Sequence, residues 1–268
     1  AKAHELGYKL EHFWLGDAGL SHRRMSDIFT ARGISGLIVA SHLPENGRPL
    51  HLDWTKFSAV KIDYYPHEPV LHNVTNDQRA IMRMAVQRIL AAGYHRIGLV
   101  MPRWWDEFGD LAWSAGFLAE QQWLPKKDQI PILYFAEGSA VRGETLVPAK
   151  PFADWMQRYQ PEVLLSLARF VGPRLKELGL LVPRDVAFVE FFHESEGGSM
   201  TGVRHNCERV GALAVETLVG QMQQHTFGVP ELPITSLVEG TWVDGETLPR
   251  RPVAPAGPSF ELPKGGNA

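Results

Sequence analysis

The stretch that decides the fold is VTNDQRAIMRMAVQRILAAGYHRIGLV, residues 74–100. Its apolar side chains recur at the three- and four-residue spacing of a helix: Ile81, Met82, Ala85, Val86, Ile89 and Leu90. Burying each of the larger ones is worth about 1.5–3 kcal/mol, so this face predicts a helix running to Ala92. Gly93 can take the left-handed conformation that ends a helix, and the apolar run at 97–100 predicts a strand. Helix, glycine and strand in this order form the repeating unit of a parallel sheet.

The start of this helix carries capping signals. Thr75, followed three residues later by Gln78, predicts a capping box in which each side chain satisfies an unpaired backbone amide. Asp77 places a negative charge at the positive end of the helix. Arg79 and Arg83 fall on the opposite face, which we expect to lie in water.

Composition excludes several classes of protein. The chain has 268 residues, enough for one large domain or two modest ones, and it is 44% hydrophobic and 21% charged, as in ordinary globular proteins. Its net charge of −3 argues against a broad nucleic-acid surface, because phosphate binding needs clustered Lys and Arg. The single cysteine, Cys207, excludes an internal disulfide and fits a reducing compartment. The sequence has no apolar run long enough to cross a membrane, so we expect a cytoplasmic protein.

The rest of the chain alternates between helical and strand patterns, which predicts an α/β protein. Expected helices are the end of one at 1–7, then 21–32, 106–122, 152–159, 172–178 and 206–223. Expected strands are 8–14, 36–40, 60–63, 130–134, 163–166, 186–191, 234–238 and 240–243. Residues 52–57 favour one short helical turn, and 44–49, 64–72 and 137–150 are expected to be loops. The tail, 249–268, is rich in Pro and Gly, which is typical of an extended or disordered end.

Three blocks of this sequence form a recognisable set. The first opens a helix with Asp77 and Gln78 and continues through Ala85-Val86 to AGYHRIGL at 92–99. The second is GLLVPRDVAFV at 179–189, and the third is VRHN at 203–206, followed by the start of a long helix. Together they resemble the effector-binding domain of the lactose/galactose-repressor (LacI/GalR) family, and they come in the order and at about the spacing of that family. The resemblance covers roughly residues 1–248.

The resemblance implies a fold of two doubly wound parallel-sheet subdomains, of the periplasmic-binding-protein-like type I, with a cleft between them. It implies three crossovers between an N-terminal subdomain of residues 1–100 plus 205–232 and a C-terminal subdomain of 101–204 plus 233–248. It also implies that a DNA-reading helix-turn-helix head, a hinge and the first strand precede residue 1, which we therefore interpret as a start inside the fold. Ligands of open α/β sheets bind beyond the carboxyl ends of the strands, which here means the cleft.

The expected function is that of the effector-sensing, dimerising part of a bacterial transcription regulator, for example a repressor. Such a homodimer binds a small molecule in its cleft and binds operator DNA only through the head, so this chain alone is not expected to bind DNA. No catalysis, cofactor or metal is expected. The sequence contains no G-x-S-x-G elbow, phosphate loop, G-x-G-x-x-G or H-E-x-x-H motif.

Two other functions remain open from the sequence. One is a periplasmic sugar-binding protein of a transporter, which shares the bilobal fold; the block GYHRIG at 93–98 favours the regulator. The other is a hydrolase or isomerase on an α/β scaffold, which rests only on analogy of fold.

The family's ligand-gripping positions are altered in this chain. An Arg expected three residues before Gly116 is Trp113, and the acidic pair expected after strand 186–191 is replaced by Phe192 and His193. A glutamine common after the third crossover is His205. The Asn-Asp pair expected near strand 163–166 is absent, and SLAR stands at 166–169. Polar groups that bind sugar hydroxyls have thus given way to aromatic ones.

We expect seven residues to form the ligand site: Asp77, Trp104, Trp105, Trp113, Phe192, His193 and His205. Asp77 either only stabilises its helix or also points into the cleft. Trp104 and Trp105 follow strand 97–100, where cleft residues originate, whereas Trp123 is expected to pack a core or an interface. Aromatic faces favour a ligand with a flat apolar side, such as a less hydroxylated sugar, a glycoside or an aromatic metabolite. The alternative is a closed pocket that senses nothing.

One acidic cluster could suggest a metal site. Glu190, His193, Glu194 and Glu196 lie close together in the sequence, but their spacing matches no standard pattern of metal ligands. We interpret them as a solvated loop after a strand. Cys207 is interpreted as a packing residue at a helix start rather than a reactive thiol.

Overall fold

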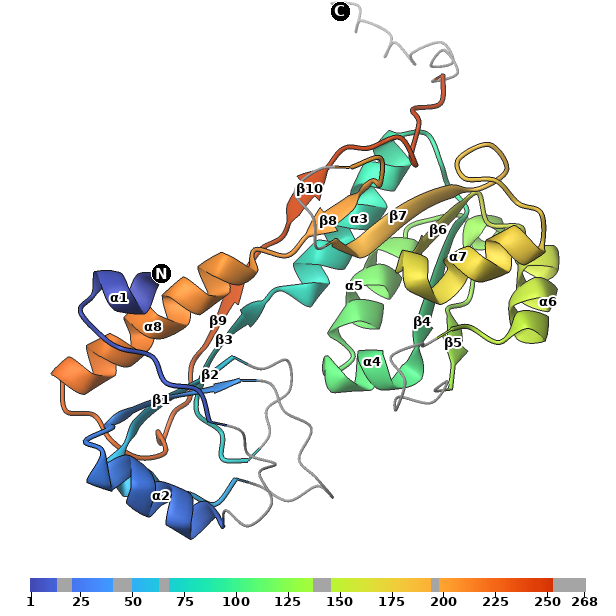
Figure 1. Ribbon diagram of the computed structural model, residues 1–268. Coiled ribbons are helices and arrows are strands. Elements are labelled where there is room, and N and C mark those ends of the chain that lie inside the picture. The colour runs from blue at the N-terminus through green and yellow to red at the C-terminus, as the bar shows by residue number, and fades with distance from the viewer. Residues whose placement is uncertain (14–20, 41–49, 63–67, 137–145, 194–197, 253–268) are drawn as a thin grey trace, which may run out of the picture.

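The computed structural model describes residues 1–13, 21–40, 50–62, 68–136, 146–193 and 198–252. Two separate sheets organise these residues into two lobes (Figure 1). We call the lobe with the four-stranded sheet the first lobe and the lobe with the six-stranded sheet the second lobe. The α/β architecture with two mainly parallel sheets is the fold expected from the sequence.

The sheet of the first lobe is entirely parallel, in the order β1-β2-β3-β9. Its strands are β1 (Gly36–Ala40), β2 (Ser58–Ile62), β3 (His72–Asn76) and β9 (Thr235–Val238). Helix α8 (Cys207–Gln223) crosses one face with α1 (Lys2–Glu5) beside it, and α2 (His22–Ala31) covers part of the other face (Figure 1). A short 3-10 turn, η2 (Trp54–Lys56), precedes β2, as expected.

The sheet of the second lobe has the order β10-β8-β7-β6-β4-β5, and only the pair β10–β8 is antiparallel. Its strands are β4 (Ile97–Pro102), β5 (Leu133–Phe135), β6 (Val163–Ser166), β7 (Ala187–His193), β8 (Gly202–Arg204) and β10 (Thr241–Val243). Its helices are α3 (Gln78–Ala91), α4 (Arg103–Phe108), α5 (Ala112–Gln121), α6 (Ala149–Tyr159) and α7 (Ala168–Glu177), with the 3-10 turn η3 (Lys126–Asp128) after α5. Helices α3 and α5 lie on one side of the sheet, and α6 and α7 lie on the other (Figure 1).

The chain passes between the lobes three times, from β3 to α3, from β8 to α8 and from β9 to β10. The sheets divide the chain differently from the expected subdomains, because α3 and β4 lie in the second lobe although α3 and most of β4 fall within 1–100. Conversely, β9 joins the first sheet although it falls within 233–248. The reason for the first difference is packing: the apolar face of α3, including Ile81 and Met82, is buried in the core of the second lobe.

Local signals around α3 are only partly as expected. Gly93 ends the helix with a φ of 88°, as predicted. The N-cap is Asp77, whose carboxylate accepts a hydrogen bond from the Ala80 amide at 2.8 Å. The predicted capping box of Thr75 and Gln78 is therefore wrong by two residues. Thr75 belongs to β3, which was predicted as part of a loop-to-helix connection because its sequence, HNVTN, is mostly polar.

Two other predictions of secondary structure are wrong, and one strand was missed. The helix expected at 106–122 is two helices, because the chain turns sharply between α4 and α5. Residues 8–13 of the strand expected at 8–14 form no strand and are exposed. Strand β8 was not predicted, since three residues carry too little pattern to be recognised. The loop expected at 44–49 and the tail beyond 252 lie outside the described residues.

The close approach of α3 and α5 requires a glycine at residue 116. A Cβ there would lie 2.6 Å from the carbonyl oxygen of Arg79 and 2.9 Å from the Cβ of Met82. Gly220 on α8 offers a matched contrast, because a Cβ there would meet nothing within 4 Å.

We predict opposite effects of alanine at these two helical glycines. Gly116→Ala forces α3 and α5 apart and should lower the free energy of unfolding by about 1–3 kcal/mol. Gly220→Ala should raise it by up to about 1 kcal/mol, since alanine is the better helix former. Urea denaturation followed by circular dichroism measures both. Equal effects of the two substitutions would contradict the packing of α3 on α5.

Candidate functional site

A crevice of about 230 Å³ lies between the lobes. Its floor is a face of the first sheet, where Lys61 lies level with Asn73 and Thr235, and Thr75 lies level with Leu237. Alternate residues of a strand point to the same face, so these side chains share one side of the sheet. The remaining lining residues come from the loop before β3, the start of α3 and the turn between α4 and α5: Val70, Leu71, Gln78, Gly109, Asp110 and Ala112.

The lining of this crevice is polar although much of it is buried. Lys61, Thr75 and Gln78 are all buried, and Gln78 is only 5% exposed. The Nε2 atom of Gln78 has no hydrogen-bond partner among the described residues. A buried donor left without a partner costs about 1–3 kcal/mol, so the crevice contains unmet hydrogen-bonding capacity.

The wall formed by the second lobe is a strained turn. Asp110 and Leu111 both have positive φ angles, 53° and 58°, which non-glycine residues seldom adopt. The fully buried carboxylate of Asp106 holds this turn, since it accepts hydrogen bonds from the Ser114 amide at 3.1 Å and from the Tyr134 hydroxyl at 2.5 Å. Burial and this hydrogen bond to Asp106 raise the pKa of Tyr134 to about 12. Backbone strain of this kind is concentrated at ligand-binding sites.

Behind this turn lies an aromatic cluster that contains five of the seven predicted site residues. The ring of Trp113 stacks on His205, with centroids 5.6 Å apart and planes inclined by 25°. The ring centroid of Phe192 lies 4.0 Å from that of His205 and 5.7 Å from that of Trp105. The ring centroids of Trp105 and Trp104 are 5.6 Å apart. The structure therefore brings these five residues together in one cluster, in which Trp113 and His205 are buried and Trp104, Trp105 and Phe192 are partly exposed.

Trp113 links the cluster to the crevice. It is 2% exposed, and a Cβ built on Gly109 would lie 2.9 Å from its Nε1 atom. Gly109 lines the crevice, so the indole lies directly beneath the wall formed by the second lobe. Trp123 is 81% exposed in this chain, which rules out the core position expected for it, whereas packing in an interface remains a prediction.

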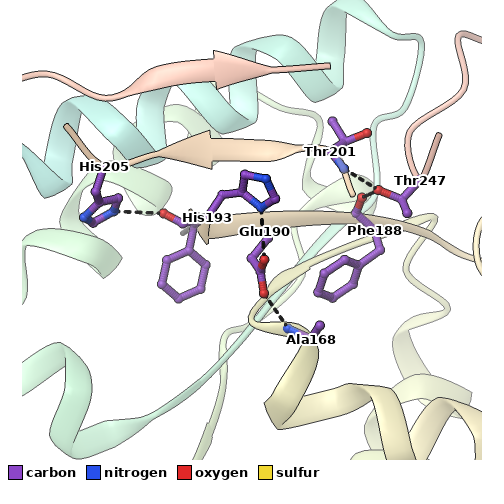
Figure 2. Close-up of polar contacts among 8 residues, drawn as sticks. Ala168, Phe188, Glu190, His193, Thr201, His205 and Thr247 are labelled. Atoms are coloured by element: carbon purple, nitrogen blue, oxygen red, sulfur yellow. Dashed lines mark hydrogen bonds and ion pairs between the residues drawn. The ribbon is translucent and has the colours of Figure 1, made fainter. Parts of the chain in front are cut away.

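His205 is a buried, neutral member of the cluster. It is 6% exposed, and its Nε2 atom lies 3.2 Å from the carbonyl oxygen of Phe191, to which it donates (Figure 2). Its Nδ1 atom is then an acceptor, and it has no partner among the described residues. Burial lowers the pKa of His205 from 6.5 to about 4.

The two other predicted site residues lie apart from the cluster. Asp77 caps α3, which is the first of the two interpretations given for it, and its contact with a ligand remains a prediction. His193 is buried, and its Nδ1 atom lies 3.3 Å from the Glu190 carboxylate (Figure 2). Glu190 also accepts a hydrogen bond from the Ala168 amide at 2.9 Å, so it holds the start of α7.

The acidic cluster shows no metal-binding geometry in the part of the chain that the structure describes. No group of three or more His, Cys, Asp or Glu side chains there could hold a metal ion. Glu194 and Glu196 lie outside the described residues. Likewise, no described helix is long and apolar enough to cross a membrane.

The polar crevice residues were missed by sequence reasoning. Lys61 is distant in the sequence from the other two, and Thr75 and Gln78 were interpreted as helix-capping residues. Nothing in their immediate neighbours indicates a shared site. The one available signal is the polar alternation of β3, where Asn73 and Thr75 face one side and Val74 faces the other. A strand whose polar side is buried is typical of a ligand-facing sheet surface.

Comparison with solved structures identifies the fold. No protein-family model and no curated protein matches the sequence. The structure is similar to a putative LacI-family regulator from Rhizobium etli, with a TM-score of 0.68 and 14% identity over 92% of this chain and 90% of that one. The chain has the fold of LacI-family transcriptional regulators.

Two further LacI-type structures contain sugars. A LacI-family regulator from Enterococcus faecium with bound ribose aligns with a TM-score of 0.59 and 14% identity, over 94% of this chain and 91% of that one. The regulator CelR in complex with cellobiose aligns with a TM-score of 0.63 and 18% identity, over 91% of this chain and 75% of that one. The resemblance carried by the three sequence blocks is thus confirmed at the level of the fold.

We predict that Trp113 is a major source of stability. Trp113→Ala removes a buried indole that contacts Phe191 and His205, and should lower the free energy of unfolding by about 3–5 kcal/mol. Trp123→Ala is the control, and it should change stability by less than about 0.5 kcal/mol because that side chain lies in solvent. Chemical denaturation of both variants tests this. A loss of similar size in the two would place Trp113 outside the core.

We also predict that His205 makes stability depend on pH. Because its pKa is lower in the folded state than in the unfolded state, the unfolded state binds the proton more readily between pH 6.5 and 4. The contribution of His205 to the free energy of unfolding is complete above pH 6.5. It falls by up to about 3 kcal/mol as the pH is lowered to 4 and does not change further below pH 4.

Glutamine at residue 205 cannot take up this proton, so His205→Gln should lose less stability than the wild type between pH 6.5 and 4. His95→Gln, which changes an exposed histidine, should keep the wild-type pH profile. Urea denaturation across this pH range compares the three proteins. A wild-type profile in His205→Gln would show that this histidine titrates normally.

Proposed function

We propose that this chain is the effector-sensing domain of a LacI-type transcriptional regulator, and that it binds a small sugar-like molecule in the crevice between its lobes. The observation that carries the proposal is the polar, buried lining of the crevice, with the unpartnered amide of Gln78. A sugar hydroxyl offers that amide an acceptor. The structures of LacI-type regulators with ribose and cellobiose support the class of ligand.

The crevice suggests how the ligand is recognised. Asn73 and Thr75 offer donors and acceptors from the first lobe, and Gln78 and Asp110 offer an amide and a carboxylate from the second. Leu71 and Leu237 provide apolar contact for the face of a sugar ring. Since the aromatic cluster is packed beneath the α4–α5 turn, its role in this proposal is to fix the shape of that wall rather than to stack on the ligand.

The mechanism is a coupling of ligand binding to the angle between the lobes. A ligand that contacts both lobes stabilises the angle at which both sets of contacts form, and this difference in affinity shifts the equilibrium. In a homodimer with DNA-reading heads, that shift would alter the spacing of the heads and their grip on an operator. The net charge of −3 agrees with DNA contact being made elsewhere than by this chain.

We predict that Gln78 contributes to sugar binding. Ribose, cellobiose or a related sugar should raise the melting temperature of the wild type, and Gln78→Leu should weaken the binding by about tenfold, equivalent to one lost hydrogen bond. Without ligand, Gln78→Leu should be as stable as the wild type or more so, because it removes an unpartnered buried amide.

Gln87→Leu on the exposed side of the same helix is the matched control and should bind as the wild type does. Calorimetric titration of a sugar library with the three proteins makes the comparison. If no sugar in a broad library raises the melting temperature, or if Gln78→Leu binds with wild-type affinity, the crevice is not the effector site.

A further inference from the structure

A second cavity, of about 290 Å³, lies in the second lobe and shares no lining residue with the crevice. It is bounded by the end of α3, the residue before β8, and β10 with the segment that follows it. The residues that line it are Arg88, Ala91, Ala92, Thr201, Trp242, Asp244, Gly245, Leu248, Pro249 and Arg250.

Two guanidinium groups line this cavity. Neither Arg88 nor Arg250 has a hydrogen-bond or ion-pair partner among the described residues, and the guanidinium carbon of Arg88 lies 5.9 Å from the centroid of the Trp242 ring. Asp244 is the one acidic side chain of the lining, and its Oδ1 atom accepts a hydrogen bond from Trp242 Nε1 at 2.8 Å. The lining therefore carries a net positive charge beside an aromatic face.

A buried hydroxyl in the lining lacks a partner. Thr201 is 2% exposed, and its amide donates to the hydroxyl of Thr247 at 2.9 Å (Figure 2). Its carbonyl oxygen accepts a hydrogen bond from the Glu190 amide at 2.9 Å. Only its own hydroxyl has no partner within the described ranges, which is uncommon for a buried polar group. This donor and the two arginines belong to the same cavity.

We propose that this cavity is a second binding site, for a small aromatic carboxylate. The carboxylate would bind between Arg88 and Arg250 and accept a hydrogen bond from the Thr201 hydroxyl. The aromatic ring of the ligand would pack against Trp242. Arginine suits this role because its planar group both pairs with carboxylates and stacks on rings. The carboxyl end of α3 and Asp244 oppose a negative ligand, but two full positive charges outweigh one full negative charge and a helix end of about half a charge.

Benzoate is the direct probe, and its binding can be followed at the indole N–H resonance of Trp242, assigned with Trp242→Phe. Benzoate should shift that resonance saturably. Inorganic phosphate, which has charge but no ring, should bind more weakly, and benzyl alcohol, which has a ring but no charge, should bind more weakly still. If benzyl alcohol binds as well as benzoate, or if the Trp242 resonance does not move at millimolar benzoate, the proposal is wrong.

Variants separate this site from the crevice. Arg88→Gln and Arg250→Gln should each weaken benzoate binding about tenfold, whereas Arg83→Gln, on the exposed side of α3, should not change it. Thr201→Val should weaken benzoate binding without lowering the melting temperature, since the hydroxyl has no partner in the free protein. Gln78→Leu should leave benzoate binding unchanged, so a failure of either proposal is distinguishable from a failure of the other. Wild-type affinity in both arginine variants would overturn the assignment.

Discussion

Hydrogen bonds between the three crossing segments determine how the two lobes are joined. The Asp77 amide, in the first crossing, donates to the carbonyl oxygen of Val238 in the third at 2.9 Å. The Asn206 side chain, in the second crossing, donates to the carbonyl oxygen of Glu239 at 2.7 Å. The three segments are thus linked to one another and not only to their own lobes. Because these two bonds link the first and second crossings to the third, they restrain how one lobe can lie relative to the other, and the geometry of the crevice depends on them.

Helix α3 is attached to both lobes. Its first residue follows β3 of the first sheet directly, and the side chain of Asp77 caps it. Its apolar face is nevertheless buried against α5 and the second sheet. The approach of the two helices at Gly116 leaves no room for a side chain, so the start of α3 cannot move independently of α5. The α4–α5 turn, which forms the crevice wall, is therefore held by the same helix that places Gln78 in the lining of the crevice.

The sequence predicted best the features that depend on neighbouring residues. The helix of residues 78–91, its glycine stop and strands β1 and β6 follow from local periodicity, and the structure has them at the expected positions. The break between α4 and α5 could not be predicted, because it depends on the buried carboxylate of Asp106, which holds a backbone amide eight residues away and the hydroxyl of Tyr134. The division into lobes depends on which core buries α3. The sequence alone cannot decide this, because the strands of both sheets are apolar enough to pack against that helix. In the candidate site, departures from the family motif singled out Trp113, Phe192 and His205, which the structure brings together, and their contact with a ligand remains a prediction. The polar crevice residues emerged only from the register of three strands.

Replacing polar ligand-binding positions by aromatic residues has a physical consequence for where a ligand can bind. An arginine or aspartate at the base of a cleft keeps that base hydrated, because its charge is costly to bury without a partner. Trp113, Phe192 and His205 instead pack on one another and exclude water, and the resulting cluster becomes continuous with the core of the second lobe. In the proposed effector site, hydrogen bonds to a ligand must then come from the first sheet, from Asp110 and from Gln78 at the start of α3, whose buried amide has no partner among the described residues.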